Sequence, residues 1–110
     1  MELNTAEECG ITRVSLSGKL DAKGAEAIEN HFIIATKGHD KVAVDLSGLD
    51  YIASIGIRIL VMAGKAASRQ GGKMVVFGAN DMVAKVLTAS GLPEIVPLHA
   101  DWTSAQAAMA

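Results

Sequence analysis

VAVDLSGLDYIASIGIR, residues 42–58, is the stretch that decides the fold of this chain. Its first five residues are mostly apolar and of strand length, which suits a central position in a parallel sheet. A short turn containing glycine follows, and Ser54 then opens a long segment with the apolar periodicity of a helix. A strand, a turn and a helix in this order indicate an α/β domain.

Similar patterns lie on both sides of this stretch. We expect strands at residues 2–6, 12–17, 42–46, 74–77 and 95–98, the first two antiparallel and the last at an edge because it contains proline. We expect helices at residues 22–36 and 54–70, a third that Asn80 or Asp81 caps and Gly91 ends, and a last one that Asp101 caps. The order predicts a single α/β domain, with about four helices on a mixed sheet of about five strands.

Each expected helix carries one apolar stripe, which should face the sheet. The expected inward residues are Ala25, Ile28, Phe32 and Ala35; Ile57, Leu60, Val61, Gly64 and Ala67; Val83, Val86 and Leu87; and Trp102, Ala105 and Met109.

The composition excludes several classes of protein. The net charge is -2 in 110 residues, without a basic block, which argues against nucleic acid as a main partner. Cys9 is the single cysteine, so we expect no internal disulfide and a reducing compartment. Residues 1–4 do not resemble the start of a secretory signal, and no apolar run approaches the roughly 20 residues that span a bilayer. We therefore expect a cytoplasmic protein without direct membrane insertion.

The sequence offers no set of residues with the spacing of a metal or cofactor site. His31, His39 and His99 are scattered, and no pair has the His-x-x-x-His spacing of a helical metal site. The glycines do not form a phosphate-binding P-loop. We expect no metal, no cofactor and no catalytic residue.

Ser54 has two interpretations from the residues alone. Serine is a favoured helix N-cap, which would explain it without any further role. The unpaired N–H groups and the positive dipole at a helix start also favour a phosphate there. Arg58 lies four residues on, on the same helical face, as a solvated side chain or as a group that steadies a phosphate. Asp45 is expected to organise the turn at residues 47–48.

Four motifs together resemble the signature of STAS domains, the family of bacterial anti-sigma factor antagonists. DLSG at residues 45–48 followed by YIASIGI at 51–57 carries most of the resemblance. SGKLD at 17–21, GGKMVV at 71–76 and SGL at 90–92 match in order and spacing. The resemblance covers essentially the whole chain.

The resemblance implies a function in transcription regulation. A stand-alone domain of this family binds an anti-sigma factor, usually a serine kinase, and so frees a sigma factor. The kinase phosphorylates a serine at the start of the second helix, which ends binding, and a phosphatase restores it. The family motif commonly reads Asp-Ser-Ser-Gly-Leu, and its first serine matches Ser54. Ala53 replaces the aspartate and Ile55 the second serine, which leaves Ser54 as the single hydroxyl in that turn.

These considerations define the expected site and partners. Ser54 is the expected phosphorylation site, and the residues expected to contact the partner are Asp21, Asp50, Ile52, Ala53, Ser54, Ile55 and Arg58. Asp21 could equally serve as the N-cap of the first helix. The partners implied are an anti-sigma factor serine kinase and a phosphatase acting on phosphorylated Ser54, while dimerisation is left open.

Two other functions stay open as alternatives. Some STAS domains are subunits of membrane transport complexes, where the domain docks permanently and Ser54 would be only a helix cap. A weak nucleotide hydrolase is the enzymatic alternative. It needs a base within hydrogen-bond reach of the serine, and no histidine lies close to Ser54 in sequence.

Overall fold

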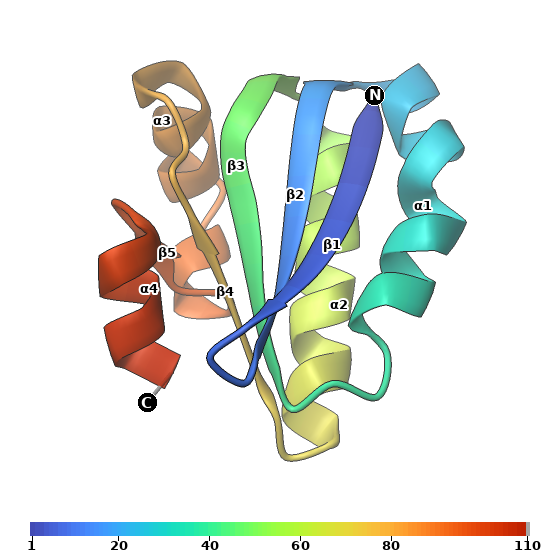
Figure 1. Cartoon of the computed structure of the whole chain (residues 1–110). Coiled ribbons are helices and arrows are strands. Elements are labelled where there is room, and N and C mark those ends of the chain that lie inside the picture. The colour runs from blue at the N-terminus through green and yellow to red at the C-terminus, as the bar shows by residue number, and fades with distance from the viewer. Residues whose placement is uncertain (110) are drawn as a thin grey trace.

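The computed structural model describes residues 1–109 and shows a mixed five-stranded sheet with helices on both faces (Figure 1). The strands are β1 (Glu2–Glu8), β2 (Ile11–Leu20), β3 (Lys41–Ile52), β4 (Lys73–Phe77) and β5 (Leu98–His99). The helices are α1 (Ala22–Thr36), α2 (Ser54–Arg69), α3 (Asp81–Ala89) and α4 (Trp102–Met109), with a short 3₁₀ turn at Leu92–Glu94. The strand order is β1-β2-β3-β4-β5, with β1 antiparallel to β2 and the other pairs parallel. The expected α/β architecture is confirmed.

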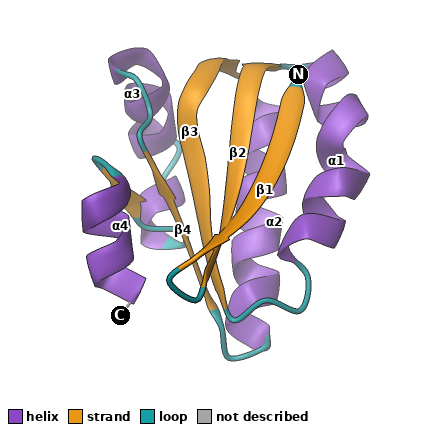
Figure 2. Ribbon diagram, in the orientation of Figure 1, coloured by secondary structure: helices purple, strands orange, loops and turns teal. Residues whose placement is uncertain are grey.

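The two faces of the sheet are covered unequally (Figure 2). Helices α1, α2 and α3 pack on one face and enclose the main core, in which Phe32, Leu60 and Leu87 are fully buried. Helix α4 covers part of the other face, where Ala105 and Met109 pack against apolar side chains of the strands. Because side chains alternate along a strand, β3 sends Val42, Val44 and Leu46 to the main core and Ala43 to the α4 side.

Local sequence signals account well for several elements. Helix α1 has the expected bounds, because Asp21 accepts a hydrogen bond from the Gly24 N–H at 2.8 Å and Gly38 follows with φ +80°. Asn80, not Asp81, caps α3 by accepting from the Val83 N–H at 2.8 Å. Asp101 caps α4 in the same way through the Ser104 N–H, at 2.8 Å.

The prediction of a turn at residues 47–48 is wrong, because β3 continues through them to Ile52. In the pairing of β2 with β3, Ser15 faces Asp45 but Ser17 faces Gly48, so β3 carries one extra residue there. A second shift follows between Gly18 and Lys19. Two β-bulges therefore absorb the glycine and the polar residues that the sequence presents as a turn.

The last expected strand is also misplaced, since residues 95–97 lie outside β5. Gly91, with φ +82°, and Pro93 instead start the 3₁₀ turn, and Ile95 is 44% exposed. Pro97 has no N–H to donate to a ladder, but its carbonyl oxygen accepts from the Val76 N–H at 3.0 Å. The edge position is confirmed, because β5 pairs with β4 alone among the described strands.

Five expected inward positions are less buried than predicted: Ala35, Ile57, Val61, Val86 and Trp102. Helix α2 is also rotated about its axis relative to the prediction. Gly56 and Ile59 are buried, whereas Ile57 and Val61 are half-buried. Ala35 of α1 is half-buried, and Val86 of α3 is 39% exposed. The rotation of α2 follows from a close contact of Gly56, described below.

Candidate functional site

The first turns of α1 and α2 meet at the carboxyl end of β2. The Ala53 N–H donates to the Leu20 carbonyl oxygen at 2.9 Å, which joins the end of β3 to the end of β2. Two glycines permit the close approach. A Cβ on Gly24 would lie 2.2 Å from the Lys19 carbonyl oxygen, and a Cβ on Gly56 would lie 2.6 Å from Leu20 Cγ. Glycine inside a helix costs stability, so its occurrence here is explained by this packing.

Ser54 is the first helical residue of α2 and is exposed. Ala53 occupies the N-cap position with extended φ and ψ of -102° and 170°, and no side chain in residues 1–109 caps the helix. The N–H groups of Gly56 and Ile57 donate to the Ala53 carbonyl oxygen, at 2.9 and 3.2 Å. The interpretation of Ser54 as a helix cap is therefore wrong, because the hydroxyl lies one residue too late to take that role.

The start of α2 is suited to an anion. Its first turn carries no acidic residue, so the positive end of the helix dipole is not compensated within that turn. The side chains of Ser54 and Arg58 are both exposed and lie four residues apart, on one face of the helix. A negatively charged group on Ser54 would thus lie near two sources of positive potential.

Asp21 is the N-cap of α1, which is one of the two roles that the sequence predicted for it. Its Oδ1 accepts from the Gly24 N–H at 2.8 Å, and its carbonyl oxygen accepts from the Ala25 N–H at 2.8 Å. The residue is half-buried. It lies one residue after Leu20, and so close to the hydrogen bond that connects β2 with Ala53.

The segment before Ser54 is the end of β3, and its side chains differ in exposure. Ile52 is only 4% exposed and packs in the main core, so its side chain offers little surface to the expected partner. Asp50 is exposed, and Ala53 and Ile55 are half-buried. Tyr51, which was not named among the residues expected to contact a partner, is 45% exposed. Strict alternation would place Asp50 and Tyr51 on opposite faces, yet both are exposed, so the strand period alone could not have found it.

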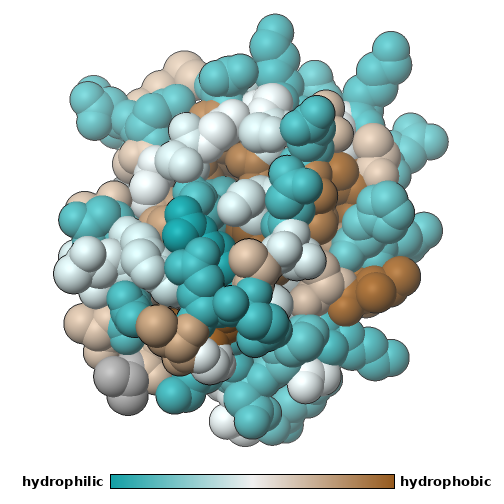
Figure 3. All heavy atoms as spheres, in the orientation of Figure 1, coloured by the Kyte–Doolittle hydropathy of each residue, from teal (hydrophilic) through white to brown (hydrophobic). Residues whose placement is uncertain are grey.

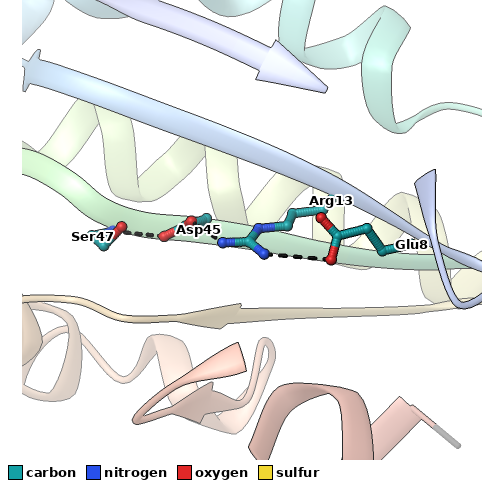
Figure 4. Close-up of polar contacts among 4 residues, drawn as sticks. All are labelled: Glu8, Arg13, Asp45 and Ser47. Atoms are coloured by element: carbon teal, nitrogen blue, oxygen red, sulfur yellow. Dashed lines mark hydrogen bonds and ion pairs between the residues drawn. The ribbon is translucent and has the colours of Figure 1, made fainter. Parts of the chain in front are cut away.

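A second polar cluster lies along the sheet, about Arg13 and Asp45 (Figure 4). The Arg13 guanidinium donates to Asp45 Oδ2 at 2.8 Å and lies 3.6 Å from a Glu8 carboxylate oxygen. The Ser47 N–H donates to Asp45 Oδ1 at 2.9 Å. Asp45 thus contacts the backbone at Ser47, but within β3 and not at the expected turn. Its pairing with Arg13 was not predicted, because sequence periodicity does not reveal which strands are neighbours.

Aromatic rings enclose the other side of the Arg13 guanidinium. Its Cζ lies 4.9 Å from the centre of the Trp102 ring and 5.3 Å from that of Phe77. The two ring centroids are 5.6 Å apart. Such contacts stabilise a cation over an aromatic face, so Arg13 connects the start of α4 to the sheet.

This environment sets the ionisation of Asp45. Burial raises the pKa of the Asp45 carboxyl, but the hydrogen bonds from Arg13 and Ser47 and the charge of Arg13 outweigh it. The net result is a pKa below the ordinary value of 3.8. Asp45 is therefore a structural carboxylate, charged near neutral pH.

Two further properties of residues 1–109 bear on the class of site. In that range, no three His, Cys, Asp or Glu side chains come together in a way that could hold a metal ion. Its helices are too short or too polar for any of them to traverse a bilayer.

The STAS domain family model matches residues 2–105. BtrV of Bordetella bronchiseptica, provisionally assigned as an anti-sigma factor antagonist, is 29% identical over 109 residues, covering 98% of this chain and 94% of BtrV. The anti-sigma F factor antagonist of Paenibacillus polymyxa is 25% identical over 101 residues, covering 90% of this chain and 86% of that protein.

Solved structures with the same fold include antagonists and a transporter. A provisionally assigned anti-sigma factor antagonist from Thermotoga maritima has a TM-score of 0.88 at 20% identity, covering 97% of this chain and 93% of that one. Phosphorylated SpoIIAA, a Bacillus cell fate determinant, has a TM-score of 0.71 at 17% identity, covering 99% of this chain and 100% of that one. The murine anion transporter Slc26a9 has a TM-score of 0.78 at 16% identity, covering 94% of this chain but 18% of the transporter.

Proposed function

This chain belongs to the STAS domain family, and we propose that it is an anti-sigma factor antagonist. In this role it binds an anti-sigma factor through the end of the molecule that carries Ser54, releases a sigma factor and so regulates transcription. The names of its two curated relatives support the proposal, since their similarity extends over 98% and 90% of this chain. We place the protein in the cytoplasm, where this partner would act, and we assign it no catalytic activity.

The position of Ser54 carries the proposal of a phosphorylation switch. The side chain is exposed, and capping of α2 does not require its hydroxyl. A phosphoryl group would add a charge of about -1.5 to -2 at neutral pH. An anion at a helix N-terminus is stabilised by about 0.3–1 kcal/mol, so the fold should tolerate the modification.

Partner binding should be far more sensitive than folding. The residues beside Ser54 include the half-buried Ala53 and Ile55 and the exposed ring of Tyr51. An interface over these side chains would desolvate the phosphate, which costs several kcal/mol unless the partner supplies a cation. Phosphorylation by the anti-sigma factor kinase would therefore end the complex, and removal of the phosphate by a phosphatase would restore it. Asp21, Asp50 and Arg58 are proposed to border the contact.

The fold shared with Slc26a9 supports one alternative. That transporter contains a region of this fold, so a permanently docked subunit of a membrane transport complex is the second candidate function. In that role Ser54 would be neither a switch nor, given its position after Ala53, a helix cap. The sequence relatives named as antagonists favour the first proposal.

Capture of partners from native lysate tests the proposal. Wild type, Ser54→Ala and Ser54→Asp serve as baits, and mass spectrometry identifies the proteins retained. We expect wild type and Ser54→Ala to retain one kinase with an anti-sigma factor role, and Ser54→Asp to lose it. Ser68→Asp is the matched control, because it adds the same charge at an exposed position near the other end of α2.

Two results would decide against this function. Retention of the kinase by Ser54→Asp would remove the switch. Retention of a transporter subunit by all four baits would favour the docked module instead.

A further inference from the structure

An apolar groove of about 280 Å³ runs between the C-terminal halves of α1 and α2. The lining residues that matter most here are Glu29, Phe32, Ile33, Lys37, Ile59 and Met62. Phe32 and Ile59 are buried, and α2 adds three alanines to the lining. Ile59 is the lining residue nearest to Ser54 in sequence, five residues or about 7.5 Å along the helix, so the groove begins more than one turn beyond Ser54.

Two large apolar side chains of the lining are exposed. Ile33 and Met62 are 48% and 59% exposed, while the neighbouring Ile34, which lies outside the lining, is 72% exposed. In Figure 3 a hydrophobic side chain protrudes at the edge of the molecule where Figure 1 places α1. Exposed apolar side chains beside a mostly apolar groove are typical of an interface.

The charges lining the groove are arranged symmetrically about Ile33. Glu29 and Lys37 lie four residues before and four residues after it, on the same ridge of α1. Neither side chain forms an ion pair within residues 1–109. Two antiparallel copies of α1 related by a two-fold axis at Ile33 would bring Glu29 of each copy opposite Lys37 of the other.

We propose that a second copy of this chain covers the groove, in a two-fold dimer whose axis passes near Ile33. An interface between identical surfaces must be self-complementary, and one charge of each sign at equal distance from the axis meets that condition. Ile33 and Met62 of each copy pack against the groove of the other. A fatty acid, with its single carboxylate, could pair with Lys37 but would leave Glu29 without a partner.

This dimer leaves both Ser54 ends exposed. The two copies of α2 run in opposite directions, so their N-termini point away from each other. The dimer can therefore bind two partner molecules at once, whatever the chemistry of that partner is. Formation of the dimer requires the groove and its charges and no property of the Ser54 end.

Charge reversal tests the pairing directly by sedimentation equilibrium over a concentration series. Wild type should show a reversible monomer–dimer equilibrium. Glu29→Lys and Lys37→Glu should each raise the dimer dissociation constant by about tenfold or more, because each variant places like charges opposite one another twice. An equimolar mixture of these two variants should associate as tightly as wild type, since the mixed dimer has opposite charges at both positions.

An apolar variant and a matched control complete the test. Ile33→Asp should be monomeric, while Met82→Asp on α3, where the side chain is also about half exposed at 51%, should dimerise like wild type. Circular dichroism checks that each variant is folded. A wild type that stays monomeric at millimolar concentration, or a mixture of the two charge variants that fails to associate, would overturn the proposal.

Discussion

The Ser54 end of the molecule and the Arg13–Asp45 cluster use polar side chains in opposite ways. Arg13 contacts two carboxylates and two aromatic rings, and the Asp45 side chain is only 9% exposed. At the Ser54 end, by contrast, Ser54, Asp50 and Arg58 are exposed, and the helix start carries no side-chain cap from residues 1–109. The two regions lie at different points along β3, since Asp45 is near its middle and Ser54 follows its end.

This difference separates polar groups that the fold requires from groups that it leaves available. Removing one member of the Arg13–Asp45 pair leaves the other in a mostly desolvated position, so the cluster belongs to the stability of the domain. The end with Ser54 is positioned by backbone contacts, through Gly24, Gly56 and the Ala53–Leu20 hydrogen bond. Its side chains can therefore change charge at little cost to folding.

The largest expected effect on stability is that of Asp45→Ala. It should lower the free energy of unfolding by roughly 2–3 kcal/mol. This is less than the loss for a fully buried pair, because the Arg13 side chain is 26% exposed and still has the Glu8 carboxylate beside it. Urea unfolding at neutral pH measures the loss. Asp50→Ala, at an exposed position of the same strand, is the control and should change stability by less than about 0.5 kcal/mol.

Gly56→Ala is expected to have the next largest effect. The added Cβ would lie 2.6 Å from Leu20 Cγ, so either the Leu20 side chain or the start of α2 must move. Overpacking of this kind costs about 1–3 kcal/mol, which urea unfolding would detect. Lys65→Ala, at an exposed position of the same helix, should be close to wild type. A Gly56→Ala variant as stable as wild type would show that the close packing does not position α2.

The pH dependence of stability should distinguish Asp45 from the exposed acids. Because its folded pKa lies below 3.8, the unfolded chain takes up this proton first as the pH falls. The stabilisation is therefore complete well above pH 3.8 and declines as the pH falls through that value and below it. Asp45→Asn should flatten this part of the profile. The pKa of Asp101 is also lowered, because its carboxylate accepts a hydrogen bond from the Ser104 backbone N–H. The part of the pH dependence that comes from Asp101 should therefore remain in Asp45→Asn.

The smallest expected effect is that of Ser54→Ala on folding. Loss of a serine N-cap would cost about 1 kcal/mol. Ala53, and not Ser54, is the N-cap of α2, so this loss should not occur. We expect a change within about 0.5 kcal/mol. Asn80→Ala, which removes a real cap, is the comparison and should lose about 1 kcal/mol. Equal losses for the two variants would contradict the assignment of Ala53 as the N-cap.

Local signals in the sequence predicted most of the elements. The bounds of α1 follow from Asp21 before it, Gly38 after it and an apolar stripe between them. By contrast, the bulges of β3 could not be predicted, because Ser47 and Gly48 are typical turn residues and only the register with β2 shows that they remain in the strand.

The site was predicted less completely than the fold. The residues alone left Ser54 as a helix cap or a position for a phosphate, and the family resemblance made it the expected phosphorylation site. Burial of Ile52 and exposure of Tyr51 depend on how β3 ends, which two bulges determine. The contact of Arg13 with Asp45 and the packing of Gly56 on Leu20 join residues more than 30 positions apart, so they depend on tertiary structure.

The central claim is that Ser54 controls binding without supporting the fold, and protein phosphorylated at Ser54 alone tests it most directly. Its free energy of unfolding and its affinity for the captured anti-sigma factor would be measured beside those of unmodified protein. We predict stability within about 1 kcal/mol and a dissociation constant raised about a hundredfold or more. An unchanged affinity, or a loss of stability large enough to explain the lost binding, would contradict the account.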